Sequence, residues 1–200
     1  MTAKNLPPVD SVALAVHRTA FGPLALGASE EALLYCVPAP LEDARARIGR
    51  AARRCVEEPG LFSAAQARLL AQARAEIDSY LRRERSFFTV RLDLRLATPF
   101  CKEVVLSLEE LVPYGRTTTY AALARDLQRP TAARAVGTAL GANPLCLILP
   151  CHRVNGSRGL TGYAGGLTVK RFLLDLENSV SATPEELLLT PATPGGRPAR

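Results

Sequence analysis

The sequence lacks the features that would place the protein in a membrane, outside the cell or around a metal. No apolar run approaches the ~20 residues that a membrane helix needs, and residues 1–10 lack the basic-then-apolar pattern of a signal peptide. The five cysteines form no C-x-x-C pair and no Cys/His cluster at zinc spacing, which argues against a disulfide framework and a metal site. We therefore expect a globular protein with no membrane partner, in the cytoplasm, or in the nucleus of a eukaryote.

The chain carries a moderate excess of positive charge. It has 25 Lys and Arg against 19 Asp and Glu, a net charge of +6, which favours a polyanionic partner without identifying one. Arginines in 45–54 and 82–85 stand among alanines and other charges at helical spacing and indicate solvated helix faces. Arg134 differs because its neighbours are small: Ala132, Ala133, Ala135 and Gly137.

The first half of the chain has the pattern of a mixed domain. Apolar stretches near turn signals predict strands over residues 11–16, 21–26, 32–35 and 88–94. Apolar residues at helical spacing predict helices over residues 41–57 and 63–83, and Ser63 is positioned as the N-cap of the second. We expect an α/β domain over residues 1–97, a small antiparallel sheet with helices.

The second half reads as mainly helical. Helices are predicted after Thr98-Pro99 over residues 100–111, 119–127, 130–140 and 167–177. Thr119 is positioned to cap the second, and Pro130 stands in the first turn of the third. The short Gln128-Arg129 link between them is typical of a helix-turn-helix. We expect this domain over 98–179, followed by a disordered tail over 180–200, which is rich in Pro, Thr and Gly.

The motif that most strongly suggests a reactive site is Pro150-Cys151-His152-Arg153-Val154. It follows an apolar, strand-like run over 145–149 and precedes a glycine-bearing loop. A buried cysteine is usually only a small hydrophobe, but this one adjoins one of only two histidines. A free thiol is only a few per cent ionised at neutral pH, so a reactive Cys151 needs a base or a lowered pKa.

This motif resembles the hallmark of the O6-alkylguanine-DNA alkyltransferases. Shorter segments of that family accompany it in the same order and spacing: Pro113-Tyr114-Gly115, Thr117-Thr118-Thr119-Tyr120, 132–137, Asn143-Pro144, 161–167 and 170–177. The resemblance is specific from about Thr98 to Glu177 and weaker before it, where 17–24 is similar to the family's first hairpin.

The resemblance implies both fold and activity. The fold would be a ribonuclease-H-like N-terminal domain and a winged helix-turn-helix-like C-terminal domain. The activity would be irreversible transfer of an alkyl group from O6 of guanine in DNA to Cys151, once per chain, with no cofactor because the thiol is the acceptor. We expect a monomer acting on double-stranded DNA that carries O6-alkylguanine; activity on O4-alkylthymine and the preferred alkyl group stay open.

For catalysis, the resemblance implies a relay from Cys151 through a water to His152 and Glu177. Because neighbours on an extended segment point to opposite sides, we expect the water rather than direct contact between Cys151 and His152. Asn143 is implied to hold the DNA-reading helix to the cysteine segment. Tyr120 is implied to lie over the flipped guanine and to help protonate it at N3.

Further residues are implied to contact DNA or the flipped base. Arg134 would take the place of the extruded nucleotide. Small side chains would let its helix lie close in the minor groove. The residues expected at the DNA surface are Arg134, Thr119, Ala132, Ala133, Ala135 and Gly137, and those expected around the substrate pocket are Cys146, Val154, Tyr163 and Ala164.

The chain departs from the family pattern at four positions. Val105 stands where tryptophan is usual, Cys146 where proline is common, Ala164 where serine is frequent and Asn155 where an aliphatic residue is common. The backbone N–H of Ala164 is unaffected, so recognition of guanine O6 should survive. A structural zinc, found in some relatives, stays open at His17, Cys36 and Cys55.

Two other functions stay open. One is an alkyltransferase-like damage sensor, although such proteins lack the cysteine that this chain has at position 151. The other is a Cys-His-Glu hydrolase. Stoichiometry separates the transferase from the hydrolase, because a hydrolase turns over and a suicide acceptor stops after one event.

Overall fold

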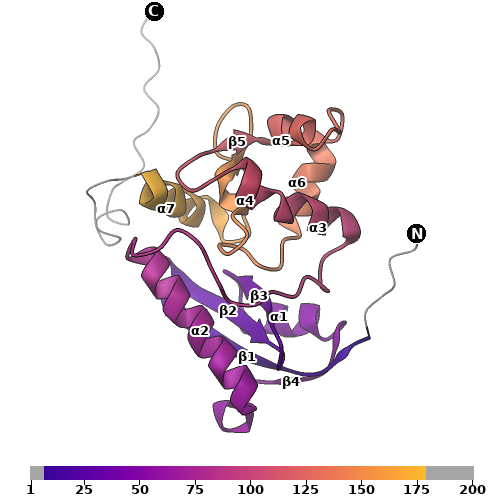
Figure 1. The fold of residues 1–200 in the computed structure, drawn as a ribbon, viewed down its shortest axis with the longest axis vertical. Coiled ribbons are helices and arrows are strands. Elements are labelled where there is room, and N and C mark those ends of the chain that lie inside the picture. The colour runs from indigo at the N-terminus through magenta and orange to yellow at the C-terminus, as the bar shows by residue number, and fades with distance from the viewer. Residues whose placement is uncertain (1–6, 179–200) are drawn as a thin grey trace, which may run out of the picture.

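The computed structural model describes residues 7–178, and its N-terminal half is built on a four-stranded sheet (Figure 1). The strands lie in the order β3 (Leu33–Val37), β2 (Gly22–Ala28), β1 (Val9–Thr19) and β4 (Ala52–Val56). The first three are antiparallel, but β4 runs parallel to β1. The sheet is therefore mixed, and the expectation of an antiparallel sheet is wrong on this point.

The mixed sheet arises from a segment that the sequence pattern assigns wholly to a helix. Helix α1 covers only Leu41–Ile48, and residues 52–56 return to the sheet as β4. In β4 only Ala52 and Val56 are buried, with exposed arginines between them, so the strand lacks the alternation that predicts one. A helix between two strands makes the parallel pairing possible.

Helix α2 (Ala64–Leu81) agrees with the prediction in position and cap. The hydroxyl of Ser63 accepts from the N–H of Gln66, whose side chain accepts in return from the N–H of Ser63, a capping box. The helix packs against β1, β2 and β3, and Figure 1 shows it lying across the sheet. Its last turn therefore points toward the other half of the molecule.

The strand expected over residues 88–94 does not form. Leu33 N donates to Arg91 O, and Asp93 N donates to Leu33 O, giving one isolated bridge between Leu33 and Leu92. The remaining backbone of this segment has no strand partner among the described residues. The segment instead leads the chain into the second half.

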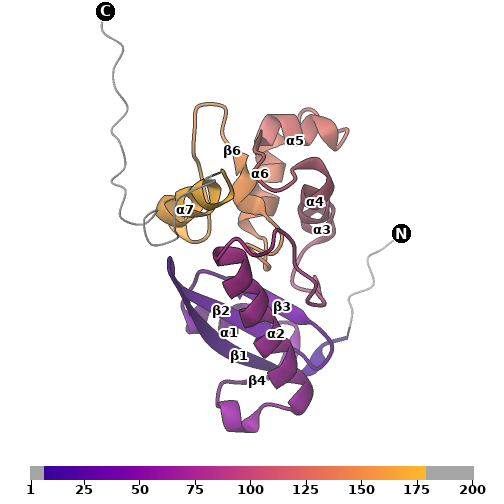
Figure 2. The same ribbon diagram turned by 60° about the vertical axis from the view of Figure 1, so that its left-hand side comes forward.

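The C-terminal half is mainly helical. Its elements are α3 (Pro99–Leu106), α4 (Leu108–Leu111), β5 (Thr118–Thr119), α5 (Tyr120–Asp126), α6 (Ala133–Gly141), β6 (Val154–Asn155) and α7 (Gly166–Asn178). Two predictions need correction: the helix over 100–111 is interrupted at Ser107, and the third helix begins at Ala133 rather than at Pro130. Thr98 and Thr119 cap α3 and α5. Figure 2 shows α3–α7 on one side of the molecule and the sheet on the other.

The apolar run before the motif is a buried turn, not a strand. Residues 145–149 are each at most 3% exposed, and Leu149 N donates to Leu145 O. Leu147 has a φ of 72°, a backbone conformation that residues other than glycine rarely adopt. Cys151–Arg153 then forms a 3₁₀ turn, so Cys151 and His152 do not lie on an extended segment as expected. Among residues 7–178, no helix is long and apolar enough to cross a membrane.

Candidate active site

Cys151 opens onto a cavity of about 230 Å³ in the C-terminal half. Tyr120, at the start of α5, and Gly137, on α6, form part of its wall, and Tyr163 and Ala164 contribute from the loop before α7. Cys151 itself is only 6% exposed. The structure thus brings together Cys151, the expected nucleophile, and three residues expected around a substrate: Tyr120, Tyr163 and Ala164.

Two residues expected to line this pocket lie elsewhere. Val154 and Cys146 are buried and are not part of the cavity wall. Cys146 instead contacts the nucleophile directly, with its Sγ 3.8 Å from that of Cys151. In this structure Cys146 is thus absent from the described cavity wall and contacts the sulfur that is expected to react.

His152 is fully buried and bound on one side only. Its Nε2 lies 2.6 Å from Glu177 Oε1, whereas its Nδ1 is buried without a hydrogen-bond partner. Because the carboxylate is an acceptor, Nε2 carries the proton and Nδ1 presents its lone pair. Burial lowers the pKa of His152 although the hydrogen bond to Glu177 raises it. The imidazole is therefore neutral at neutral pH, with one nitrogen free to accept a proton.

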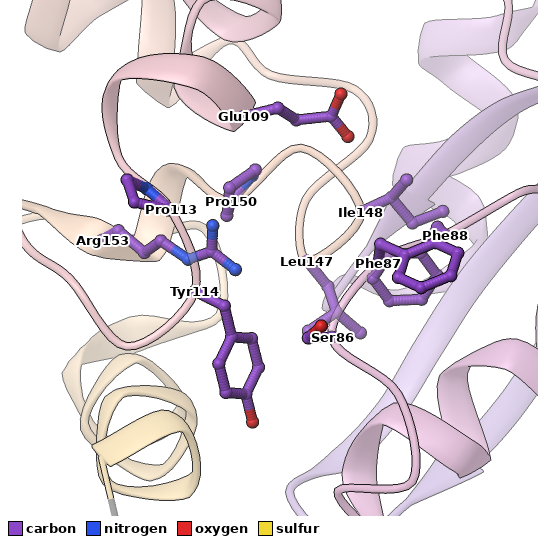
Figure 3. Close-up of a pocket in the computed structure, with 10 residues that line it drawn as sticks. All are labelled: Ser86, Phe87, Phe88, Glu109, Pro113, Tyr114, Leu147, Ile148, Pro150 and Arg153. Carbon is purple, nitrogen blue, oxygen red and sulfur yellow. The ribbon is translucent and has the colours of Figure 1, made fainter.

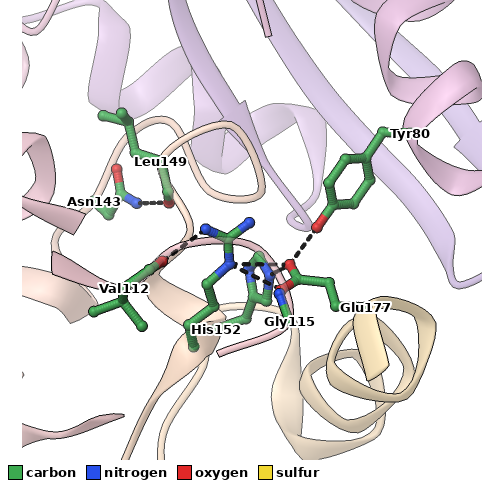
Figure 4. Close-up of polar contacts among 8 residues, drawn as sticks. Tyr80, Val112, Gly115, Asn143, Leu149, His152 and Glu177 are labelled. Atoms are coloured by element: carbon green, nitrogen blue, oxygen red, sulfur yellow. Dashed lines mark hydrogen bonds and ion pairs between the residues drawn. The ribbon is translucent and has the colours of Figure 1, made fainter. Parts of the chain in front are cut away.

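Glu177, on α7, collects donors from both halves of the protein. Tyr80, at the end of α2, donates its hydroxyl to Oε1, and the Gly115 N–H donates to Oε2 at 3.0 Å. Arg153 Nε lies 2.9 Å from Oε2. Figure 4 shows Tyr80, His152 and Gly115 converging on this carboxylate.

The donors around Glu177 decide its charge. Burial alone would raise the pKa of Glu177, but the hydrogen bond from His152, the Arg153 charge and the Tyr80 hydroxyl outweigh it and lower the pKa to about 2. The carboxylate is therefore ionised at any physiological pH and can hold the His152 ring in one tautomer.

Asn143 fixes the turn that carries the cysteine. Its Nδ2 donates to Leu149 O, and its Oδ1 accepts from Leu145 N, each at 2.9 Å. The side chain thus bridges the two ends of the buried run just after α6, and Figure 4 shows its contact with Leu149. This bridge accounts for a turn where the apolar pattern indicated a strand.

The surroundings of Cys151 favour its thiolate. The contact with the Cys146 thiol lowers the pKa of Cys151, burial raises it, and Asn143 and the charge of Lys170 lower it further, so that the net shift is downward. Cys146, by contrast, has a pKa raised by Cys151 and by burial. Of the two neighbouring sulfurs, Cys151 is the one that ionises.

Three residues of the site were not assigned a role from the sequence. Lys170 is fully buried and donates to Val154 O and Thr161 O, both at 2.6 Å, joining β6 to the loop before α7. Lys170 and Arg153 belong to segments that carried the resemblance, and that was the available signal. Tyr80 gave none, because it lies 97 residues before Glu177.

The residues expected at the DNA surface lie on or beside α6. Arg134 is exposed and makes no ion pair with a described residue. Ala135 is exposed, Ala132 and Ala133 are half-buried, and Thr119 caps the neighbouring α5. One turn after Arg134, Gly137 borders the cavity of Cys151. Helix α6 therefore joins an exposed arginine to the reactive site.

A second, larger cavity of about 520 Å³ lies between the two halves. Figure 3 shows Phe87 and Phe88 on one side of it and Pro113 and Tyr114 on the other. Arg153 lines this cavity, but Cys151 does not. It is thus distinct from the cavity of the nucleophile.

The three residues left open as zinc ligands do not form a site. His17 Nε2 lies 2.8 Å from Asp78 Oδ1, and Cys36 is buried in the core. Within the described part of the chain, no group of three or more His, Cys, Asp and Glu is placed to hold a metal ion.

Sequence comparison connects this geometry with known proteins. A family model described as the DNA-binding domain of 6-O-methylguanine DNA methyltransferase matches residues 99–179. The inducible methylated-DNA–protein-cysteine methyltransferase of Bacillus subtilis is 47% identical over 108 residues, 54% of this chain and 59% of that protein. The Methanosarcina acetivorans enzyme of that name is 46% identical over 109 residues, 54% of this chain and 69% of that protein.

Solved structures extend the similarity to both halves of the chain. Mycobacterium tuberculosis OGT, solved in complex with DNA, superimposes with a TM-score of 0.70 at 33% identity, covering 90% of this chain and all of that one. An O6-methylguanine-DNA methyltransferase from Pyrococcus kodakaraensis shares the fold with a TM-score of 0.63 at 23% identity, covering 84% of this chain and 99% of that one. On this sequence identity, coverage and fold, the chain belongs to the methylated-DNA–protein-cysteine methyltransferase family.

Proposed function

We propose that this protein repairs DNA by direct reversal, taking an alkyl group from O6 of guanine onto Cys151. The observation that carries the proposal is the pairing of a buried His152–Glu177 couple, free at Nδ1, with a cysteine that opens onto a cavity beside Tyr120 and Tyr163. A cysteine nucleophile can be activated by a nearby base, and His152, the next residue in the chain, has a ring nitrogen without a hydrogen-bond partner.

The transfer step balances without a cofactor. The Cys151 proton passes through a water to His152 Nδ1, and the thiolate attacks the alkyl carbon. The carbon–O6 bond breaks, a thioether forms, and the leaving guanine takes a proton at N3 from the Tyr120 hydroxyl. The phenolate regains a proton from solvent, and His152 releases the thiol's proton to solvent. Because the thioether is stable, each chain reacts once.

On the DNA side, α5 and α6 would act as a helix-turn-helix that approaches the minor groove. The exposed Arg134 would occupy the space of the extruded nucleotide, and the small residues beside it would permit close approach. This proposal includes the finer fold description: a ribonuclease-H-like half over residues 1–97 and a winged helix-turn-helix over 98–179. It also includes a monomer, acting inside the cell on double-stranded DNA carrying O6-alkylguanine.

Mass spectrometry after incubation with duplex DNA containing O6-methylguanine tests the function. We expect one methyl group per chain, located by fragmentation on Cys151 and not on Cys146, and none in Cys151→Ser. A methyl group on Cys146, or no adduct at all, would overturn the assignment. Continuous turnover of an ester or peptide substrate would indicate the hydrolase instead.

A further inference from the structure

We propose that Cys146 is a resolving thiol, which closes a reversible disulfide with Cys151 when a peroxide oxidises the nucleophile. The inference concerns regulation of the same site and rests on the proposed function only for its consequence for repair. The disulfide itself depends on two sulfurs and an oxidant.

Among the described residues, Cys146 is the cysteine whose sulfur contacts that of Cys151. The two Sγ atoms lie 3.8 Å apart, so a bond of about 2.05 Å requires them to approach by roughly 1.8 Å. Within residues 7–178, the other hydrogen bond of the Cys146 thiol is a long one to Asn143 O at 3.5 Å. Cys36 also lies nearby, because its strand β3 bridges to Leu145, but its sulfur makes no contact with Cys151 among the described hydrogen bonds. Cys101 is engaged with Ala139 O at 3.2 Å, and Cys55 lies in β4 of the other half.

The two sulfurs differ in access and in ionisation, as attacking and resolving thiols should. Cys151 borders the cavity and has a lowered pKa, so a small peroxide reaches a thiolate there. Cys146 is 1% exposed and has a raised pKa, so it stays a thiol until its neighbour is oxidised. Oxidation therefore begins at Cys151.

The reaction balances in two steps. The Cys151 thiolate attacks one oxygen of hydrogen peroxide, the O–O bond breaks, and a sulfenic acid and one water result once the protons are counted. The Cys146 sulfur then attacks the Cys151 sulfur, the S–O bond breaks, and the Cys146 proton leaves with the oxygen as a second water. Two thiols and one peroxide thus give one disulfide and two waters.

The disulfide changes the fate of the repair thiol under oxidation. It blocks alkyl transfer while it lasts, because the accepting electron pair is engaged. It also protects Cys151 from further oxidation to sulfinic acid, which thiol reductants do not reverse. A chain without Cys146 would lose its single acceptor permanently.

The test compares wild type, Cys146→Ser and Cys101→Ser after hydrogen peroxide, with and without subsequent dithiothreitol. Tryptic peptide 135–153 contains Cys146 and Cys151 and no other cysteine. In wild type and Cys101→Ser we expect this peptide to lose two hydrogens, and each protein's own alkyl transfer to be lost and then regained with dithiothreitol. In Cys146→Ser we expect two or three added oxygens on Cys151 and no recovery.

Two outcomes would overturn the proposal. One is recovery of Cys146→Ser to the same extent as wild type, and the other is a wild-type disulfide joining Cys151 to a different cysteine, or none. The mass of the peptide is read without DNA. A disulfide in a protein that transfers no alkyl group would therefore leave this inference standing and refute the proposed function alone.

Discussion

At His152, one hydrogen bond decides which ring nitrogen can act. His152 Nε2–H donates a hydrogen bond to the carboxylate of Glu177, so the lone pair is at Nδ1, the buried nitrogen without a hydrogen-bond partner. No direct hydrogen bond joins Cys151 to this ring among the described contacts. We therefore infer that the proton passes from the thiol to Nδ1 through a bridging water. The base of the relay is thus fixed by a residue 25 positions away.

Removing this base should slow transfer without weakening DNA binding. We expect His152→Ala to reduce the single-turnover rate on duplex O6-methylguanine by about 10²-fold or more, the usual contribution of a general base, while DNA affinity stays near wild type. His17→Ala, which alters the other histidine, is the control and should react at the normal rate. An unchanged rate in His152→Ala would show that the thiolate forms without it.

The Cys146 thiol should lower the pKa of the neighbouring Cys151 thiol. Because the Cys146 contact is the largest influence lowering the pKa of Cys151, Cys146→Ala should raise that pKa, whereas Cys146→Ser keeps a donor and should change it less. The rate of alkylation by iodoacetamide as a function of pH measures both. A pKa in Cys146→Ala equal to that of wild type would contradict this account.

At the scale of elements, the nine residues of α6 contribute to the core, to the exposed surface and to the cavity of Cys151. Val136, Ala139 and Leu140 are buried against the core, while Arg134 faces solvent. Gly137 borders the cavity, where an added Cβ would lie 3.7 Å from the Tyr120 ring. In the proposed function, this helix would connect the DNA contact at Arg134 with the cavity of Cys151.

Arg134 should matter for extruding the base and not for the chemistry. We expect Arg134→Ala to slow repair of a paired lesion strongly but to spare reaction with free O6-benzylguanine, which needs no flipping. Arg68→Ala, an exposed arginine on α2, should leave both reactions unchanged. Equal losses on duplex and free base would mean that Arg134 supports the fold or the cysteine site.

For the whole molecule, Glu177 is one of the points where the two halves meet. The hydroxyl of Tyr80 reaches it from α2, and Cys36 N, on β3, donates to Pro144 O at 2.8 Å beside the buried turn. The N-terminal half thereby helps to orient the Glu177 carboxylate, which binds His152. It supplies no described residue to the cavity of Cys151.

This arrangement predicts a loss of stability in acid. The pKa of Glu177 is about 2 in the folded protein and about 4.3 when unfolded. Its stabilising contribution is therefore present above about pH 4.3 and is lost as pH falls through 2, an effect on the order of 3 kcal/mol. Urea unfolding between pH 6 and pH 2 measures it. Glu177→Gln should be less stable at pH 6 and should show a weaker dependence on pH over this range.

The sequence by itself determined the elements with local signals. Capping hydroxyls at Ser63 and Thr119 set the starts of α2 and α5, because a cap needs only residues within the first turn. The motif around Cys151 and the segments around it indicated the family for the same reason, since their information lies in order and spacing. The division near residue 97 and the tail over 180–200 stay predictions, the tail lying outside the described residues.

Only the tertiary structure decided the features that depend on partners far along the chain. Residues 52–56 become a strand because β1 offers a parallel edge, and residues 88–94 do not, because Leu33 provides their one pairing point. The apolar run becomes a turn because Asn143 bridges its ends. The contacts of Tyr80 with Glu177 and of Cys146 with Cys151 follow from these folds, since side-chain distances across a core are set by packing and not by local sequence.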